Sequence, residues 1–200
     1  MARNVKVVIN KRAVLRDVMT SSKRSLALQI RRSLAPEILK KQKQLQGDFE
    51  SHPVTREIEQ GPYANNISGL TNGYGNLFSF IGFEANSTPT IDIKRIFDRK
   101  ITYSVRSLKQ SGSFKVSMSI PTLEEVFSAT PIPWAGGLSW AEGIEKGISN
   151  LGSYVYSSNT KTSSRSGSGL QVSKSTGSSF DTTPYISKII EDFKNNLRKI

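Results

Sequence analysis

The sequence predicts an α+β fold, in which a small antiparallel β-sheet packs with amphipathic helices from the two ends of the chain and long flexible loops connect them. Three patterns indicate this class. An apolar repeat of helical period runs through the first quarter of the chain, apolar and polar residues alternate between residues 101 and 120, and a helical period returns after residue 183. With 200 residues, the chain is long enough to bury a hydrophobic core, and we expect a single domain over residues 1–200.

The N-terminal quarter reads as a short strand followed by a helix. Residues 5–9 are rich in β-branched side chains, and Asn10 is a suitable N-cap for the helix. Residues 20–22 offer a break, Pro36 predicts a kink or a second break, and Gly47 is a typical stop. The apolar stripe of this helix repeats every four residues at Leu26, Ile30, Leu34 and Ile38, and Leu45, seven residues further on, extends it.

Residues 49–75 contain many glycine, proline and asparagine residues, which predicts a long loop with one helical turn at 54–60. Loops of this length are usually functional arms or partly disordered. Residues 77–83 and 91–96 have strand-like apolar content, and the second stretch also fits a short helical turn.

The alternation between residues 101 and 120 predicts a β-hairpin with one apolar face, turning near Gly112. The apolar positions of this hairpin are Ile101, Tyr103, Val105, Phe114, Val116, Met118 and Ile120. Thr122 and Glu125 then form a capping box, which predicts a short helix that ends before Pro131.

The segment 131–156 contains both tryptophans of the chain, Trp134 and Trp140. Ser139 and Glu142 form a second capping box. An apolar stripe of helical period runs through this segment and consists of Leu138, Ala141, Ile144, Ile148 and Leu151. Gly143 and Gly147 lie four residues apart, which allows another backbone to approach closely. The tryptophans are either core residues or anchors for a neighbouring subunit, so the interface candidates are Trp134, Trp140, Gly143 and Gly147.

The last part of the chain combines a flexible segment with a helix. Residues 157–179 include ten serines and three glycines among 23 residues, a composition that cannot bury enough apolar surface to order itself. Thr183 and Pro184 then predict a helix start. The apolar face of this helix consists of Ile186, Ile189, Ile190, Phe193, Leu197 and Ile200.

Positive charge is concentrated at the N-terminus. The chain has 28 Lys and Arg against 16 Asp and Glu, and residues 1–46 contain twelve of these basic residues and two acidic ones, which gives 12 − 2 = +10 of the net +12. The basic helix is a solvated face, a phosphate-binding surface or a surface for the acidic rim of a partner. The candidates for contact with DNA or an acidic partner are Lys11, Arg12, Lys23, Arg24, Arg31, Arg32, Lys40, Lys41 and Lys43.

No helix-turn-helix, zinc-finger or RNP pattern is present, so contact with nucleic acid would be made through the phosphate backbone and would depend on salt. The chain has no Cys, its single His52 lies in the irregular region, and no phosphate-binding loop or metal-loop spacing occurs. We therefore expect a binding or assembly protein without a cofactor, not an enzyme. No apolar run approaches the roughly 18 residues of a membrane span, which favours a soluble, non-secreted protein.

Three stretches of the sequence resemble the head-tail connector, or neck, and tail-completion proteins of tailed bacteriophages. The first is the opening at 5–18 with the basic helix that follows to Leu45. The second is the polar Ser/Gly stretch that leads into 180–193, and the third is the segment Pro-Trp-Ala-Gly-Gly-Leu-Ser-Trp-Ala-Glu-Gly-Ile-Glu-Lys-Gly-Ile at 133–148.

The resemblance implies a structural virion protein located at the neck or tail end, and in the host cytoplasm during assembly. It implies a homo-oligomeric ring, six-fold or twelve-fold, that joins the capsid portal or adaptor to tail-terminator or tail-tube proteins. This implied ring contacts the phosphate backbone of packaged DNA and helps to seal or align the DNA exit. It does not specify whether the chain is an adaptor, a stopper, a tail terminator or a completion protein. The alternative is a basic, non-sequence-specific nucleic-acid-binding protein that acts alone.

Overall fold

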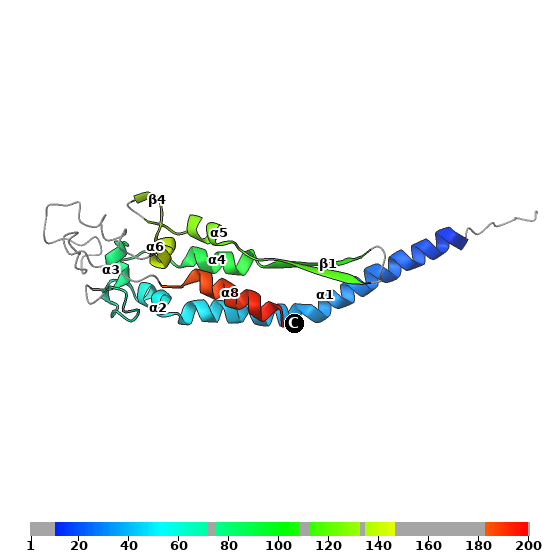
Figure 1. The fold of residues 1–200 in the computed structure, drawn as a ribbon, viewed down its shortest axis with the longest axis horizontal. Helices are drawn as coiled ribbons and strands as arrows, with labels where there is room; N and C mark the ends of the chain where they lie inside the picture. The colour runs from blue at the N-terminus through cyan, green and yellow to red at the C-terminus, as the bar shows by residue number, and fades with distance from the viewer. Residues whose placement is uncertain (1–10, 72–74, 109–112, 133–134, 147–182, 200) are drawn as a thin grey trace, which may run out of the picture. The chain divides into compact units, whose positions relative to one another are not determined.

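The computed structural model describes residues 11–71, 75–108, 113–132, 135–146 and 183–199 (Figure 1). These residues form helices and two small antiparallel two-stranded sheets, which confirms the α+β class. The sequence predicts one domain, and the structure divides the chain into two compact units. Unit 1 comprises residues 1–39 and 102–119, and unit 2 comprises 40–101 and 120–200.

Unit 1 combines a helix with the predicted hairpin. Helix α1 (Lys11–Ser51) belongs to unit 1 up to Leu39 and to unit 2 from Lys40. Strands β1 (Thr102–Ser107) and β2 (Phe114–Ser119) pair antiparallel. Tyr103 faces Met118 and Val105 faces Val116 across the pair, so the predicted apolar positions share one face and the hairpin is confirmed.

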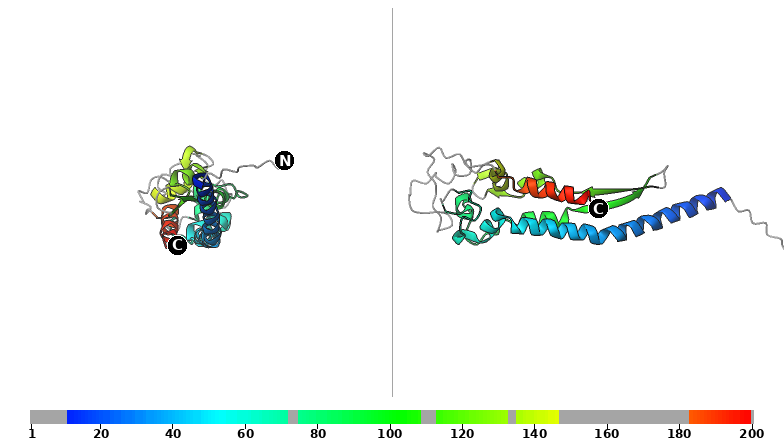
Figure 2. Two further views of the ribbon diagram at one scale, coloured as in Figure 1. Left: turned by 90° about the vertical axis from the view of Figure 1, so that its right-hand side faces the viewer. Right: turned by 60° about the horizontal axis from the view of Figure 1, so that its bottom comes forward.

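Helix α1 is continuous at all three positions where the sequence predicts a break or a stop (Figure 2). At Thr20 the side-chain hydroxyl donates to the Arg16 carbonyl at 2.8 Å, so this residue bonds within the helix instead of capping a new one. Pro36 lies inside the helix. Beyond Gly47 the helix continues because Leu45 and Phe49, on either side, are both buried in the core of unit 2, and this packing outweighs a glycine penalty of about 1 kcal/mol.

The predicted apolar stripe of α1 is not buried along its whole length. Ile38, Leu45 and Phe49 are buried, whereas Leu26 is 48% exposed. A step of four residues rotates a position by about 40° around an α-helix, so Leu26 lies about 120° from Ile38. The repeat therefore winds around the helix, so Leu26 does not share a side of the helix with Ile38.

Unit 2 contains the hydrophobic core of the described residues. Its elements after α1 are α2 (Pro53–Glu59), the 3₁₀ turn η1 (Gly61–Tyr63), α3 (Leu77–Ile81), α4 (Ile91–Arg99), α5 (Leu123–Ser128), β3 (Pro131–Ile132), β4 (Ala135–Ser139), α6 (Trp140–Lys146) and α8 (Ile186–Leu197). Strands β3 and β4 pair antiparallel. None of the helices in the described ranges is long and apolar enough to cross a membrane.

The strand predictions for 77–83 and 91–96 are wrong, because both stretches are helical. Every residue of α3 is buried, so it shows no apolar periodicity, and Asn76 caps it by accepting a hydrogen bond from the Ser79 amide at 2.9 Å. In α4 the buried residues Ile93 and Phe97 lie four apart. The alternative of a helical turn at 91–96 is thus confirmed.

The predicted loop at 49–75 is partly helical and is organised by one buried carboxylate. It contains the end of α1, helix α2, which confirms the predicted turn at 54–60, and η1. Glu57 is fully buried on α2. Its two oxygens accept hydrogen bonds from the amides of Ser68 and Leu77, both at 2.7 Å. The carboxylate therefore fixes the chain at two points beyond its own helix.

Helix caps in unit 2 follow the sequence closely. Thr122 and Glu125 form both hydrogen bonds of the predicted capping box, and α5 ends before Pro131 as expected. At the second predicted box, the Ser139 hydroxyl accepts from the Glu142 amide at 3.1 Å.

The C-terminal helix α8 is confirmed, but it begins at Ile186, two residues after the predicted start at Pro184. Ile186, Ile189, Ile190 and Phe193 are its buried residues. Tyr185 precedes the helix, is fully buried, stacks on Phe49 with ring centroids 6.0 Å apart, and shares a 2.7 Å hydrogen bond with the Thr55 hydroxyl.

Some of the sequence predictions concern positions outside the described residues. These are the strand at 5–9, the N-cap at Asn10, the hairpin turn near Gly112, the flexible segment at 157–179, Trp134, Gly147, Ile148, Leu151 and Ile200.

Candidate protein and nucleic-acid interface

The basic candidates of α1 lie on its accessible surface. Exposed side chains belong to Arg12, Arg24, Arg31, Arg32, Lys40 and Lys43, and half-buried ones to Lys23 and Lys41. Lys11 is the first residue of α1, and its side chain lies outside the described part of the chain. The ion pairs found among the described residues involve basic side chains of α4, α6 and α8 and Lys100, and none involves a basic side chain of α1. The candidates whose side chains are described therefore lie exposed or half-buried without an acidic partner in this part of the chain.

The positive charge of α1 is not confined to one side. At about 100° of rotation per residue, Arg12, Arg16 and Lys23 fall within about 40° of one another. Arg24 and Arg32 lie roughly 100–180° away from that group. The helix thus offers positive charge on more than one side.

The hairpin contacts α1 at Arg31. The Tyr103 hydroxyl of β1 donates to the Arg31 carbonyl oxygen at 3.0 Å, and the Arg31 guanidinium carbon lies 5.7 Å from the centre of the Tyr103 ring. Sequence reasoning placed both residues in the correct element type but gave no signal that they meet, because contacts between distant segments leave no local pattern. Arg31 is thus partly held by its own chain.

Helix α1 also exposes large apolar side chains, which sequence reasoning missed. Five of them are between 48% and 59% exposed, and they are Val18, Met19, Leu26, Leu28 and Leu39. For Leu26 the signal that could have shown this is the four-residue spacing of the stripe, which turns around the helix as described above, whereas the other four lie outside the stripe. Contiguous exposed apolar patches mark protein contacts, and Met19 and Leu26, seven residues apart, lie within about 20° of each other around this helix.

Trp140 belongs to the core and not to an interface. Its side chain is 1% exposed, and its ring meets the Phe83 ring edge-on with centroids 5.8 Å apart. Gly143 is half-buried on the same helix α6. Of the two alternatives for Trp140, the structure favours the core residue, since its own chain already covers it, while Trp134 and Gly147 lie outside the described residues.

His52 caps a helix. It is the N-cap of α2, its Nδ1 accepts a 3.3 Å hydrogen bond from the Val54 amide, and its ring lies 4.8 Å from that of Tyr185. Burial lowers the pKa of His52, because it penalises the charged form. Since a protonated Nδ1 can no longer accept, the imidazole must be neutral to cap α2.

We expect the stability to fall as the pH drops through the folded-state pKa of His52. A lowered folded-state pKa means that the contribution is complete above the unfolded value of about 6.5 and is lost as His52 is protonated in the folded protein. Thermal unfolding between about pH 7.5 and pH 5 should therefore show a larger drop in Tm for the wild type than for His52→Asn, which keeps a cap that does not titrate. Equal drops for the two proteins would contradict this role.

Comparisons with protein-family models, curated proteins and solved structures found no match. Within the described residues, no group of three or more His, Cys, Asp or Glu side chains is arranged to hold a metal ion.

Proposed function

We propose that the chain is a structural protein of a bacteriophage neck, without enzymatic activity. Copies of it form a ring that joins the portal or adaptor side of the capsid to the tail and helps to seal or align the DNA exit channel. The observation that carries this proposal is the surface of α1, where large apolar side chains and basic side chains are exposed together.

The apolar part of this surface favours a protein partner. Burying exposed apolar area stabilises a complex by about 25 cal/mol per Å², and Val18, Met19 and Leu28 each expose more than half of their surface. Binding to DNA phosphates would need only the positive charges. A helix that carries both kinds of side chain suits a subunit that contacts other proteins in an assembly through which DNA passes.

The second candidate function is binding of nucleic acid by the protein alone. It is favoured by the basic side chains of α1 that form no ion pair with an acidic side chain in the described part of the chain. This function predicts binding that weakens steeply with salt, because each phosphate contact releases a counterion.

Reversing three charges of α1 separates the two functions. The variant Lys40→Glu with Lys41→Glu and Lys43→Glu should keep its ability to form a ring if the protein is a connector. If the protein acts alone on nucleic acid, the variant should lose DNA binding. Variants with fewer reversed charges should still bind DNA. For these, the slope of the logarithm of the DNA-binding constant against the logarithm of the salt concentration should become shallower by about 0.9 for each phosphate that the protein no longer neutralises. Sedimentation velocity and DNA titration measure the two properties.

A matched control reverses three basic residues at the end of the chain, Lys194, Arg198 and Lys199, all of them exposed. It makes the same change in net charge outside α1. The connector function would be contradicted if the α1 variant stays folded, as judged by circular dichroism, but forms no ring while the control variant forms one.

A further inference from the structure

Unit 2 has a groove whose charge is opposite to that of α1. Its volume is about 500 Å³, and its lining comes from α5, β3, β4 and α6. The residues that line it are Glu124, Phe127, Ser128, Pro131, Gly137, Leu138, Ser139 and Glu142. Glu124 is exposed, and Glu142 forms one ion pair, with Lys146, whose own side chain is 71% exposed. The groove thus has apolar walls and two carboxylates.

The apolar lining of this groove is accessible. Leu138 is 40% exposed, Pro131 is exposed and Phe127 is half-buried, although Phe127 also packs against the core. An accessible apolar lining flanked by carboxylates suits an apolar side chain flanked by basic ones.

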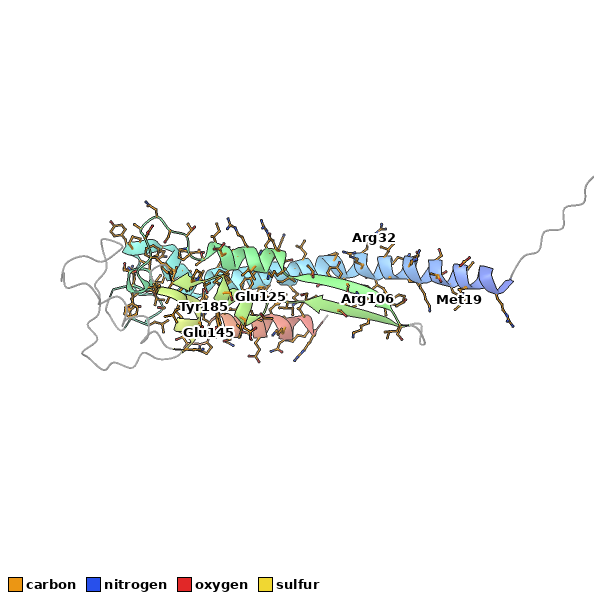
Figure 3. All side chains as sticks on the ribbon, turned by 90° about the horizontal axis from the view of Figure 1, so that it is seen from above. Met19, Arg32, Arg106, Glu125, Glu145 and Tyr185 are labelled. Carbon is orange, nitrogen blue, oxygen red and sulfur yellow. The ribbon has the colours of Figure 1, made fainter. Side chains whose placement is uncertain are left out.

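One face of α1 has that composition. Arg12, Arg16, Met19, Thr20 and Lys23 are neighbours on the surface of the N-terminal part of the helix. Met19 is 59% exposed and follows Arg16 by three residues and precedes Lys23 by four. Figure 3 labels it on the N-terminal part of α1. We call Arg16, Met19 and Lys23 the basic knob and Glu124, Leu138 and Glu142 the acidic groove.

We propose that the basic knob of one copy docks in the acidic groove of a second copy of this chain. Methionine is an adaptable side chain that fills irregular apolar sites, and Met19 would contact Leu138 and Phe127 while Arg16 and Lys23 face Glu124 and Glu142. The apolar contact supplies most of the affinity, because exposed ion pairs contribute little, and the charges set the orientation. This inference rests on the proposed ring function.

The knob and the groove are different surfaces of the same chain, so their contact is heterologous. Such contacts repeat from one copy to the next and close into a ring if the rotation between copies permits it. Docking of two knobs on each other would instead bring like charges together. The proposal therefore supplies the kind of contact that a ring of identical subunits requires.

Two sets of substitutions test the docking. The knob variant combines Arg16→Ala, Met19→Ala and Lys23→Ala, and the groove variant combines Glu124→Gln, Leu138→Ala and Glu142→Gln. Each should weaken self-association of the full-length, nuclease-treated protein at least about tenfold in sedimentation velocity. Because each variant keeps the surface that is altered in the other, an equimolar mixture of the two should form 1:1 dimers that do not grow into larger species.

Matched controls change similar side chains elsewhere. In unit 1, the combination Arg106→Ala, Lys115→Ala and Val116→Ala alters two exposed basic residues and one exposed apolar residue of the hairpin and leaves α1 unchanged. In unit 2, the control combines Ile67→Ala, Glu84→Gln and Glu191→Gln. Ile67 is 40% exposed, as Leu138 is, and Glu84 and Glu191 are exposed carboxylates. Both controls should associate as the wild type does.

Three results would overturn the docking. First, a wild-type protein that stays monomeric at all concentrations has no such contact. Second, a mixture of the two variants that stays monomeric shows that the knob and the groove do not meet. Third, a knob or groove variant that associates as the wild type does shows that another surface is used. Wild-type rings that persist in both variants would overturn this inference while the connector function stands. A protein that assembles on DNA alone would contradict both.

Discussion

Replacing Trp140 with alanine is expected to lower the free energy of unfolding by about 3–5 kcal/mol, the cost of removing a large aromatic side chain from a packed core. The residue is 1% exposed and packs edge-on against Phe83, so the substitution leaves a cavity that the surrounding helices fill only in part. Chemical denaturation followed by circular dichroism measures the destabilisation.

The matched control is Tyr63→Ala, which removes an aromatic side chain that is 85% exposed. Its free energy of unfolding should change by less than about 0.5 kcal/mol. A Trp140→Ala protein with wild-type stability but defective assembly would contradict the core placement and restore this residue as an interface anchor.

Replacing Glu57 with glutamine should lower the free energy of unfolding by about 2–4 kcal/mol. The carboxylate accepts hydrogen bonds from the amides of Ser68 and Leu77 through different oxygens, and it is fully buried. Glutamine can place an oxygen at only one of these amides and presents an NH₂ group to the other, so one buried donor is left without an acceptor. Denaturation curves measure the change in stability.

Glu84→Gln is the control for this substitution, because Glu84 is an exposed carboxylate. Hydrogen exchange at the Ser68 and Leu77 amides gives a second readout that is specific to these two hydrogen bonds. Both amides should exchange faster in Glu57→Gln and at the wild-type rate in Glu84→Gln. Unchanged protection of both amides would contradict the role of this carboxylate.

Local patterns predicted the elements whose signal is contained within one segment. The β1–β2 hairpin follows from strict alternation, the start of α5 from the Thr122 capping box, and the buried face of α8 from its helical period. In each case the residues that set the structure are neighbours along the chain, so the sequence shows them directly.

The elements that were predicted wrongly depend on tertiary packing. Helix α3 is buried on all sides, and an apolar run without periodicity does not distinguish a buried helix from a strand. Gly47 is a helix stop by propensity, but the core holds Leu45 and Phe49 in place around it. The role of Glu57 was not foreseen, because its partners lie 11 and 20 residues away.

The candidate interface was predicted in part. The concentration of basic residues on α1 is visible in the sequence, and most of these side chains are indeed exposed. Their apolar companions, such as Met19 and Leu28, were missed, and so was the acidic groove, which brings together α5, the β3–β4 sheet and α6. A groove of this kind exists only once the chain has folded.

Native mass spectrometry of the nuclease-treated protein over a range of ionic strengths tests the central claim most directly, namely that copies of the chain form a ring. The connector function predicts a closed six-fold or twelve-fold species that persists as ionic strength rises, because apolar contacts are not screened by salt. A monomer that gathers only on DNA at low salt and is released at high salt would contradict the ring and favour the nucleic-acid-binding function.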